Sequence, residues 1–524
     1  MSEHKKIAAS AFVMSAATFI SRVLGFIRDM IVARFLGASG VSDSFFVAFR
    51  VPNLLRELFA EGSMSSGFIP VLTEYKTNKG EKETVDLVRV TFTFIVVIIG
   101  LICILGIVFA TPIVKLIAPG FVNDVAKFNS TVDLTQVMFP FLLFVSLSAL
   151  TMGALNTKKK FFVPAMASAC FNVTIIITIT LFYSYFKEPV MSVAVGVTVG
   201  GLSQFLWQLP MFFKNNYSLR PYFNFSHPGL KKVGALVFPA AAGTAVAQFN
   251  IFMSTILASY LPTGSITYLY YAMRLIQFPV GIFGVAMGMA VLPTLSEHAA
   301  RGEFETLTKD FAFSLKLLFA ITVPSMAGLI VLSEPIVSTL LQRGQFDHTA
   351  VKATASALVC YSMGIWAMVG VRVVASTFYA MQNTKTPVKT AMISVLVNMF
   401  LSIVLMQYLS HAGLALANAL ASAVNFLLLF YLLRSRLLTL DASDIGVSFM
   451  KTLTSSVIMG LVGWYMIRLT HWDLTDSSIS KTVFLTCTIA LCVLAYTISA
   501  LSLKSEEVHY IYQIIMAKTS GRKK

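Results

Sequence analysis

Apolar stretches of about 20 residues alternate with short polar segments along the whole chain. A helix of that length is about as long as the hydrocarbon core of a bilayer is thick. The first, second and tenth stretches are longer than a bilayer needs and carry glycine, proline or charged residues, so we expect bends or breaks there. The pattern predicts fourteen membrane-spanning helices, near residues 8–36, 42–72, 88–111, 131–155, 161–186, 190–213, 232–260, 266–295, 311–333, 350–380, 388–408, 411–433, 447–469 and 480–503.

The second half of the chain repeats motifs of the first at a spacing of about 225 residues. Ala48-Phe49-Arg50 corresponds to Ala272-Met273-Arg274, and Asn156-Thr157-Lys158 corresponds to Asn383-Thr384-Lys385. The repeat unit contains six spans, an even number, so both copies enter the membrane from the same side.

The repeat predicts an all-α polytopic membrane protein with two six-helix lobes and two further helices. The expected parts are residues 1–215, 216–436 and 437–524, the last with the two extra helices and a polar tail. Two such lobes around a cavity are usual in alternating-access transporters. A receptor or scaffold with duplicated helices is the alternative.

Composition and charge agree with a membrane protein. Of 524 residues, 56% are hydrophobic and 12% are charged, and the mean hydropathy is +0.78. The net charge of +16 does not indicate a nucleic-acid partner, because Lys and Arg concentrate in alternate loops. We count 26 on the side of the two termini and 7 on the other. The positive-inside rule therefore places both termini in the cytoplasm.

Seven arginines lie inside the predicted spans, where one arginine costs about 2.5–3.5 kcal/mol on insertion scales. Arg34 and Arg50 are the weaker candidates, and Arg34 is near enough to a span end to reach the interface. Five lie well away from the ends: Arg22, Arg28, Arg56, Arg274 and Arg372.

These five arginines face only three acids in the same spans, Asp29, Glu57 and Glu61. Structural ion pairs between helices would balance, whereas this set leaves about two surplus positive charges. The imbalance favours a cavity for an anion such as a diphosphate, because arginine forks bind phosphate oxygens in pairs.

Spacing relates the charges of the first span. Arg22 and Asp29 are seven residues apart and share a helix face, while Arg28 lies about 100° from Asp29. Gly25 would let the helix bend between the two arginines. Asp29 can therefore neutralise one arginine and leave the other for a ligand.

The second span carries a further polar face. Asn53, Glu57 and Glu61 follow at four-residue spacing, and Arg56 lies beside them. Asp43, in the turn between the first two spans, is either a helix cap or part of an outer gate.

Enzyme motifs do not stand out in the sequence. It has no P-loop, no nucleophile elbow and no His or Cys pairs at metal-ligand spacing, so we expect neither metal nor cofactor. The five cysteines all fall in apolar spans, as small buried hydrophobes do.

Two motifs resemble one family closely. Ser21-Arg22-Val23-Leu24-Gly25-Phe26-Ile27-Arg28-Asp29, and Pro52-Asn53-Leu54-Leu55-Arg56 with Phe59-Ala60-Glu61-Gly62, resemble the MurJ (MviN) family of lipid II flippases. That family belongs to the MATE-like multidrug/oligosaccharidyl-lipid/polysaccharide exporter superfamily. Supporting matches extend over nearly the whole chain, including Tyr270-Tyr271-Ala272 and Lys385-Thr386-Pro387-Val388-Lys389.

The resemblance implies fourteen helices and a cationic central cavity. It implies export of undecaprenyl-pyrophosphate-linked peptidoglycan precursor, lipid II, across the bacterial inner membrane. Spans 13 and 14 would form a groove for the polyprenyl tail, and cell-wall synthesis or division proteins are conceivable partners. By the same resemblance, the substrate-binding charges are Arg22, Arg28, Asp29, Arg56 and Arg274, and Asp43 and Glu61 bear function; Asn53, Glu57 and Arg372 support the site by position alone.

Two positions depart from some members of the family, including the enterobacterial ones. Met273 and Gln277 replace acids that flank the arginine of the eighth span there. Their absence leaves Arg274 less neutralised, so the role of those acids does not carry over.

The expected function is flipping of lipid II by alternating access. An exporter of another lipid-linked oligosaccharide or of a drug is the first alternative. A membrane enzyme acting on polyprenyl-linked sugars and a non-transporting scaffold for cell-wall synthesis are alternatives from other classes.

Overall fold

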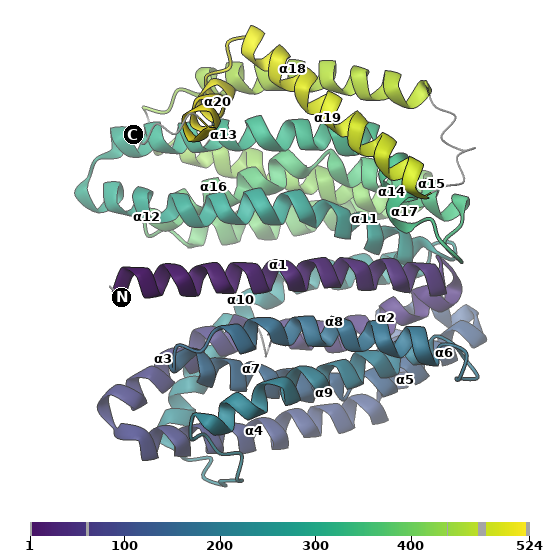
Figure 1. The fold of residues 1–524 in the computed structure, drawn as a ribbon, viewed down its shortest axis with the longest axis vertical. Helices are drawn as coiled ribbons and strands as arrows, with labels where there is room; N and C mark the ends of the chain where they lie inside the picture. The colour runs from purple at the N-terminus through teal and green to yellow at the C-terminus, as the bar shows by residue number, and fades with distance from the viewer. Residues whose placement is uncertain (1–2, 59–61, 438, 470–477, 520–524) are drawn as a thin grey trace. The chain divides into compact units, whose positions relative to one another are not determined.

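The computed structural model describes residues 3–58, 62–437, 439–469 and 478–519, and every structural statement below concerns those ranges. They are helical throughout, with short turns and no β-strand (Figure 1). Each of the fourteen predicted spans coincides with helix, and nine described helices are long and apolar enough to cross a membrane. The prediction of an all-α polytopic membrane protein is confirmed.

Contacts group the chain into two compact units. The first is Met1–Thr267 with Arg343–Phe346, and the second is Tyr268–Gln342 with Asp347–Lys524. The predicted lobe boundary at 215/216 stays a prediction, since this grouping keeps the next helix with the N-terminal ones through its packing on the helix Gly62–Asn78.

The first unit consists of antiparallel helices joined by short turns, and its most buried helix is the one at Phe141–Thr157. Its elements are α1 (Glu3–Leu36), α2 (Gly40–Arg56), α3 (Gly62–Asn78), α4 (Gly80–Val108), α5 (Ala110–Ile117), η2 (Pro119–Asn123), α6 (Val125–Met138), α7 (Phe141–Thr157), α8 (Phe162–Phe182), α9 (Met191–Lys214) and α10 (Pro228–Ser259).

The second unit repeats this order of long and short helices and adds three at the end (Figure 1). Its elements are α11 (Ser265–Pro279), whose first turn belongs to the first unit, η3 (Val280–Gly284), α12 (Val285–Arg301), α13 (Phe304–Val331), α14 (Ser333–Leu341), α15 (His348–Ser362), α16 (Ile365–Ala380), α17 (Lys385–Arg434), α18 (Ala442–Arg468), α19 (Ser478–Ser502) and α20 (Glu506–Thr519).

The bounds of these elements support the duplication. The starts of α5 and α14, Ala110 and Ser333, are 223 residues apart, as are the starts of α6 and α15 at Val125 and His348. The starts of α7 and α16, Phe141 and Ile365, are 224 residues apart. The short interrupting helices thus recur at the spacing of the sequence motifs.

A break falls in the tenth span, where a turn at 363–364 separates α15 from α16. In the second span α2 ends at Arg56, residues 57–58 are π-helical and α3 begins at Gly62, so any break at 59–61 lies outside the described residues. The first span is a correction, because α1 runs unbroken through Gly25 (Figure 1). A single glycine such as Gly25 weakens a helix but does not by itself interrupt its hydrogen bonds.

Two further interruptions were not expected. The fourth span is divided between α6 and α7 at Pro140, whose ring removes a backbone donor. In the eighth span a π-helical turn, η3, follows directly after Pro279. Such turns are frequent where a helix is under local constraint.

Candidate substrate site

The arginines of α1 lie inside a helix longer than a bilayer is thick. Its 34 residues correspond to about 51 Å at 1.5 Å per residue, against about 30 Å of hydrocarbon. Arg28 precedes the end of the helix at Leu36 by eight residues, or about 12 Å, so it is not a residue of the last turn.

The guanidinium of Arg28 is held by two residues from different helices. Its Nε and Nη2 donate to Oδ1 of Asp29 at 3.1 and 2.7 Å, and its Nη1 donates to Oδ1 of Asn172 on α8 at 3.0 Å. Asn172 is fixed in turn, because its Nδ2 donates to the carbonyl of Ser21 at 3.1 Å. Asp29 is 3% exposed, so the pair is largely removed from solvent. These contacts fix the position of the Arg28 guanidinium.

Arg22 is in a different position. Asp29 pairs with its neighbour Arg28 rather than with Arg22, although Arg22 shares its face of the ideal helix. The Arg22 side chain is exposed, and within the described part of the chain it makes no hydrogen bond or ion pair. Asp29 thus pairs with Arg28, and a ligand role for Arg22 stays a prediction.

A second polar cluster forms where α2 ends. The Arg56 Nε donates to Oδ1 of Asn53 at 3.1 Å, and its Nη2 lies 3.7 Å from Oε1 of Glu57. Asn53 Nδ2 also donates to that Oε1 at 3.3 Å. Gln248, a buried residue of α10, donates to the other oxygen of Glu57. Glu61 lies outside the described residues.

Asp43 is buried and caps the start of α11, a helix that is distant from it in the sequence. It is 1% exposed, and its Oδ1 accepts from the backbone N–H and the hydroxyl of Thr267 at 3.0 and 2.8 Å. Its Oδ2 accepts from the backbone N–H of Gly264 at 2.7 Å and from Nζ of Lys127 at 3.1 Å. Asp43 thus satisfies the first amides of α11. The helix that Asp43 itself belongs to, α2, is capped by Ser39 instead, and a role of Asp43 in an outer gate stays a prediction.

Arg274 and Arg372 belong to the second unit. Arg274 is half-buried on α11, and the side chain of Gln277 one turn later is exposed. On α16, the stem of Arg372 lies against the glycines of η3 and α12: a Cβ at Gly284 would lie 3.3 Å from its Cδ, and one at Gly288 would lie 3.8 Å from its Cβ. Small residues four apart let the two helices approach closely.

Sequence reasoning did not assign a role to Asn172, Gln248 or Lys127. The signal available for Asn172 and Gln248 was a neutral amide inside an apolar span, and such amides usually hydrogen-bond between helices. Lys127 was counted only as a loop charge, yet its side chain is 9% exposed and it completes the Asp43 site. Three or more metal-binding side chains do not gather anywhere in the described ranges.

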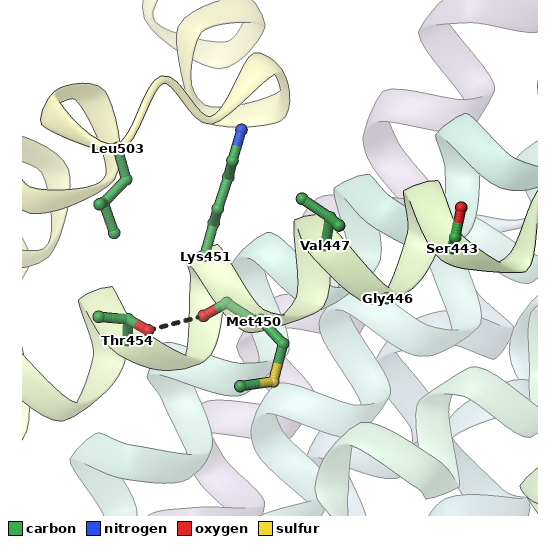
Figure 2. Close-up of a pocket in the computed structure, with 7 residues that line it drawn as sticks. All are labelled: Ser443, Gly446, Val447, Met450, Lys451, Thr454 and Leu503. Atoms are coloured by element: carbon green, nitrogen blue, oxygen red, sulfur yellow. Dashed lines mark hydrogen bonds between the residues drawn. The ribbon is translucent and has the colours of Figure 1, made fainter.

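A hollow of about 480 Å³ lies along α18 near the end of α19 (Figure 2). Leu503 closes one side of it, and Lys451 extends past it toward the turn that leads into α20. The hollow is mostly apolar, and its lining residues are Ser443, Gly446, Val447, Met450, Lys451, Thr454 and Leu503.

Comparison with known proteins gives one consistent family. The family model described as lipid II flippase MurJ matches residues 32–485. The chain is 37% identical over 424 residues to the probable lipid II flippase MurJ of Buchnera aphidicola subsp. Baizongia pistaciae (strain Bp), covering 81% of the chain and 83% of that protein. It is 37% identical over 427 residues to the lipid II flippase MurJ of Burkholderia cenocepacia, with 81% and 83% covered.

Solved structures agree. The inward closed conformation of a lipid II flippase MurJ is 29% identical and matches with a TM-score of 0.77, covering 93% of this chain and 98% of that one. An inward-facing multidrug resistance MATE family transporter of the MOP superfamily shares the fold, at 12% identity and a TM-score of 0.68 over 82% of this chain and 98% of that one. With the family model matched over most of its length and relatives above 30% identity, the chain belongs to the MurJ family of lipid II flippases.

Proposed function

We propose that this protein flips lipid II, the undecaprenyl-pyrophosphate-linked peptidoglycan precursor, from the cytoplasmic to the outer leaflet. Membership in the family supports the substrate. The observation that carries the site is the Arg28 guanidinium, which Asp29 and Asn172 hold in place well inside α1. A guanidinium that is already held in place loses less conformational entropy when it binds a phosphate than a mobile one does.

In this proposal the substrate-binding charges are Arg22, Arg28, Asp29, Arg56 and Arg274. Arg22, which has no described partner, would bind pyrophosphate oxygens directly, and Arg28 would add a second fork. Asp29 and Glu57 would orient arginines and limit the net charge. Asn53, Glu61 and Arg372 would support the site.

The proposed membrane is the inner membrane of a bacterium, with both termini in the cytoplasm. The distribution of 26 against 7 basic residues supports this orientation. The head of lipid II would enter from the cytoplasmic side and leave on the other, after the capped start of α11 at Asp43 is released. Cell-wall synthesis or division proteins are further proposed partners.

The polyprenyl tail would stay in lipid and lie along α18 and α19. The apolar hollow beside Val447, Met450 and Leu503 supports that placement, because an isoprenoid chain offers no hydrogen bonds (Figure 2). Lys451 at its edge would lie at headgroup depth.

Membrane potential is the proposed driving force. A net-positive cavity that returns inward is favoured by an inside-negative potential, at about 2.3 kcal/mol per charge per 100 mV. Collapsing the potential at constant pH gradient should slow flipping. An unchanged rate would remove this coupling from the proposal and leave the substrate assignment intact.

The test is lipid II exposure in cells depleted of the protein and rescued with wild type or Arg28→Ala. An externally added lipid II-cleaving enzyme reports exposure on the outer face. Product should disappear on depletion and return only with wild type. Persistent exposure in cells without other flippases would contradict the substrate and favour an exporter of another lipid-linked oligosaccharide.

A further inference from the structure

The helix that lines the hollow, α18, has two different faces. Ser443, Val447, Met450 and Thr454 recur every three or four residues and face the hollow (Figure 2). Asp444, Ser448, Thr452 and Ser455 form a second, polar row on another face. The last three are buried, at 7%, 1% and 0% exposure, so they pack inside the protein although they are polar, whereas Asp444 at the start of the row is exposed.

One lysine of α13 meets this polar row. Lys316 is 8% exposed, and its Nζ lies 2.8 Å from Oδ2 of Asp444 on α18. The same Nζ lies 3.8 Å from Oε1 of Glu507 and 4.0 Å from Oε2 of Glu506, both in the first turn of α20. A single cation therefore links α13, α18 and α20.

Glu507 is the most buried of the three acids. Its side chain is 4% exposed; Ser448 of α18 donates to Oε1 at 2.9 Å, and Ser505 donates to Oε2 at 2.8 Å. The next residue, Val508, packs in an apolar cluster with Ala320 and Met459. Burying a carboxylate is costly without such partners, so these contacts hold the first turn of α20 at a defined place.

The turn between α19 and α20 is fixed from both sides. On the side of the hollow, Lys451 donates to the carbonyl of Lys504 at 3.3 Å. On the other side, Ser505 and Glu507 join it to the Lys316 cluster. Leu503, which borders the hollow, is the first residue of this turn. Where the turn lies therefore sets how far Leu503 stands from α18.

We infer that Lys316, Asp444 and Glu507 form a latch that holds the cytoplasmic end of the polyprenyl groove open. The inference rests on the proposed function, because it assigns the hollow to the tail of the flipped lipid. Lys316 is a positioning residue, since it acts on the lipid only through α18 and the α19–α20 turn. Without it, the buried Glu507 loses its cation, the first turn of α20 leaves its place, and Leu503 no longer borders a fixed groove.

The experiment compares two lipid II analogues on the purified full chain, one with the undecaprenyl tail and one with a tail of three isoprene units. Their dissociation constants are measured for wild type, Lys316→Met, Lys316→Arg and Glu507→Gln. Lys309→Met is the matched control, because Lys309 is on the same helix but pairs with Glu305 at the surface. A melting temperature for each variant monitors folding.

The latch predicts that wild type and Lys309→Met prefer the long tail. Lys316→Met and Glu507→Gln should lose about tenfold in affinity for the long-tail analogue, while the short-tail analogue binds as before. Lys316→Arg keeps a cation in the cluster and should recover most of the long-tail preference. A loss confined to the long tail is not expected from general destabilisation.

Other outcomes overturn the latch. Unchanged long-tail affinity in a folded Lys316→Met protein would do so, as would equal loss for both analogues. If Lys316→Met does not fold, Glu507→Gln decides in its place, since unchanged long-tail affinity in that folded variant would overturn the latch as well. A wild type that binds both analogues equally refutes the tail groove and the latch but leaves the flippase standing, whereas one that binds neither refutes the flippase itself.

Discussion

The position of the Arg28 guanidinium depends on a residue that carries no charge. Asn172 accepts from Nη1 and is itself tied to the carbonyl of Ser21, so it links α8 to α1 at the position of the candidate anion site. Hydrogen bonds to charged groups contribute about 1.5–3 kcal/mol, which is more than neutral ones contribute.

Replacing Asn172 by Ala should therefore slow flipping by about tenfold or more while Arg28 keeps its ion pair with Asp29. The rate of lipid II exposure in depleted cells measures the effect. Thr180→Ala is the control, because that exposed hydroxyl bonds only within α8, to the carbonyl of Ile176. Wild-type flipping by Asn172→Ala would show that Asp29 alone positions the fork.

Asp43 and Lys127 are expected to be strongly coupled. Removing one partner of a buried ion pair leaves an uncompensated charge, at a cost of about 3–5 kcal/mol. We expect Asp43→Asn and Lys127→Met each to lower thermal stability markedly, and the double variant to lose less than the sum. The exposed pair Glu305 and Lys309 should show coupling below about 0.5 kcal/mol in the same cycle. Additive effects at Asp43 and Lys127 would contradict this account.

At this scale the sequence identified the charges but not most of their partners. Arginines inside apolar spans are visible without a structure because each is costly there. Which acid meets which arginine depends on side-chain direction and on the neighbouring helix, as the pairing of Asp29 with Arg28 rather than Arg22 illustrates. Gln248 and Asn172 gave only the weak signal of an amide among apolar residues.

At the scale of single elements, α17 contains an abrupt reversal of the chain. Its two spans meet at Ser410, where φ is 51° and ψ is −130°, a conformation that non-glycine residues rarely adopt. The hydroxyl of Ser394 donates to the carbonyl of Ala421, so the two halves of α17 lie side by side. A Cβ at Gly413 would come within 2.3 Å of the Leu405 carbonyl oxygen, which shows how close the turn is.

Ser410→Gly should leave stability unchanged or raise it, because glycine adopts this conformation without steric cost. Ser410→Val should lower it by about 1–3 kcal/mol, since a β-branched side chain is the least compatible with positive φ. Thermal unfolding of the two variants in one detergent makes the comparison at a single position. Equal melting temperatures would mean that the turn relaxes to another backbone conformation.

The existence of the long helices could be predicted, because a bilayer dictates their length and hydrophobicity. Their interruptions could be predicted only in part. The turn between α15 and α16 lies in a span where an interruption was expected, whereas the division at Pro140 and the π-helical turn after Pro279 were not expected. A proline inside a span is tolerated or not according to what its neighbours supply in place of the lost hydrogen bond.

For the whole chain, the orientation in the membrane is the property that the charge pattern predicts most directly. A cysteine at Lys159, in the loop between α7 and α8, should react with an impermeant maleimide only after permeabilisation. A cysteine at Lys187, between α8 and α9, should react in intact spheroplasts. Native cysteines, of which Cys487 is exposed, are replaced first. The opposite pattern would invert the proposed topology and the direction of export.

In the proposed topology the reversal at Ser410 lies on the outer side of the membrane, which has a consequence for what can bind the protein from there. The chain reverses direction within about one residue there. The α17 hairpin therefore has no extended loop that a protease could cleave or an antibody could bind. An epitope tag inserted at 410 should disrupt folding, whereas the longer segment between α8 and α9 should accept one. The α17 hairpin is thus a poor target for an externally applied inhibitor.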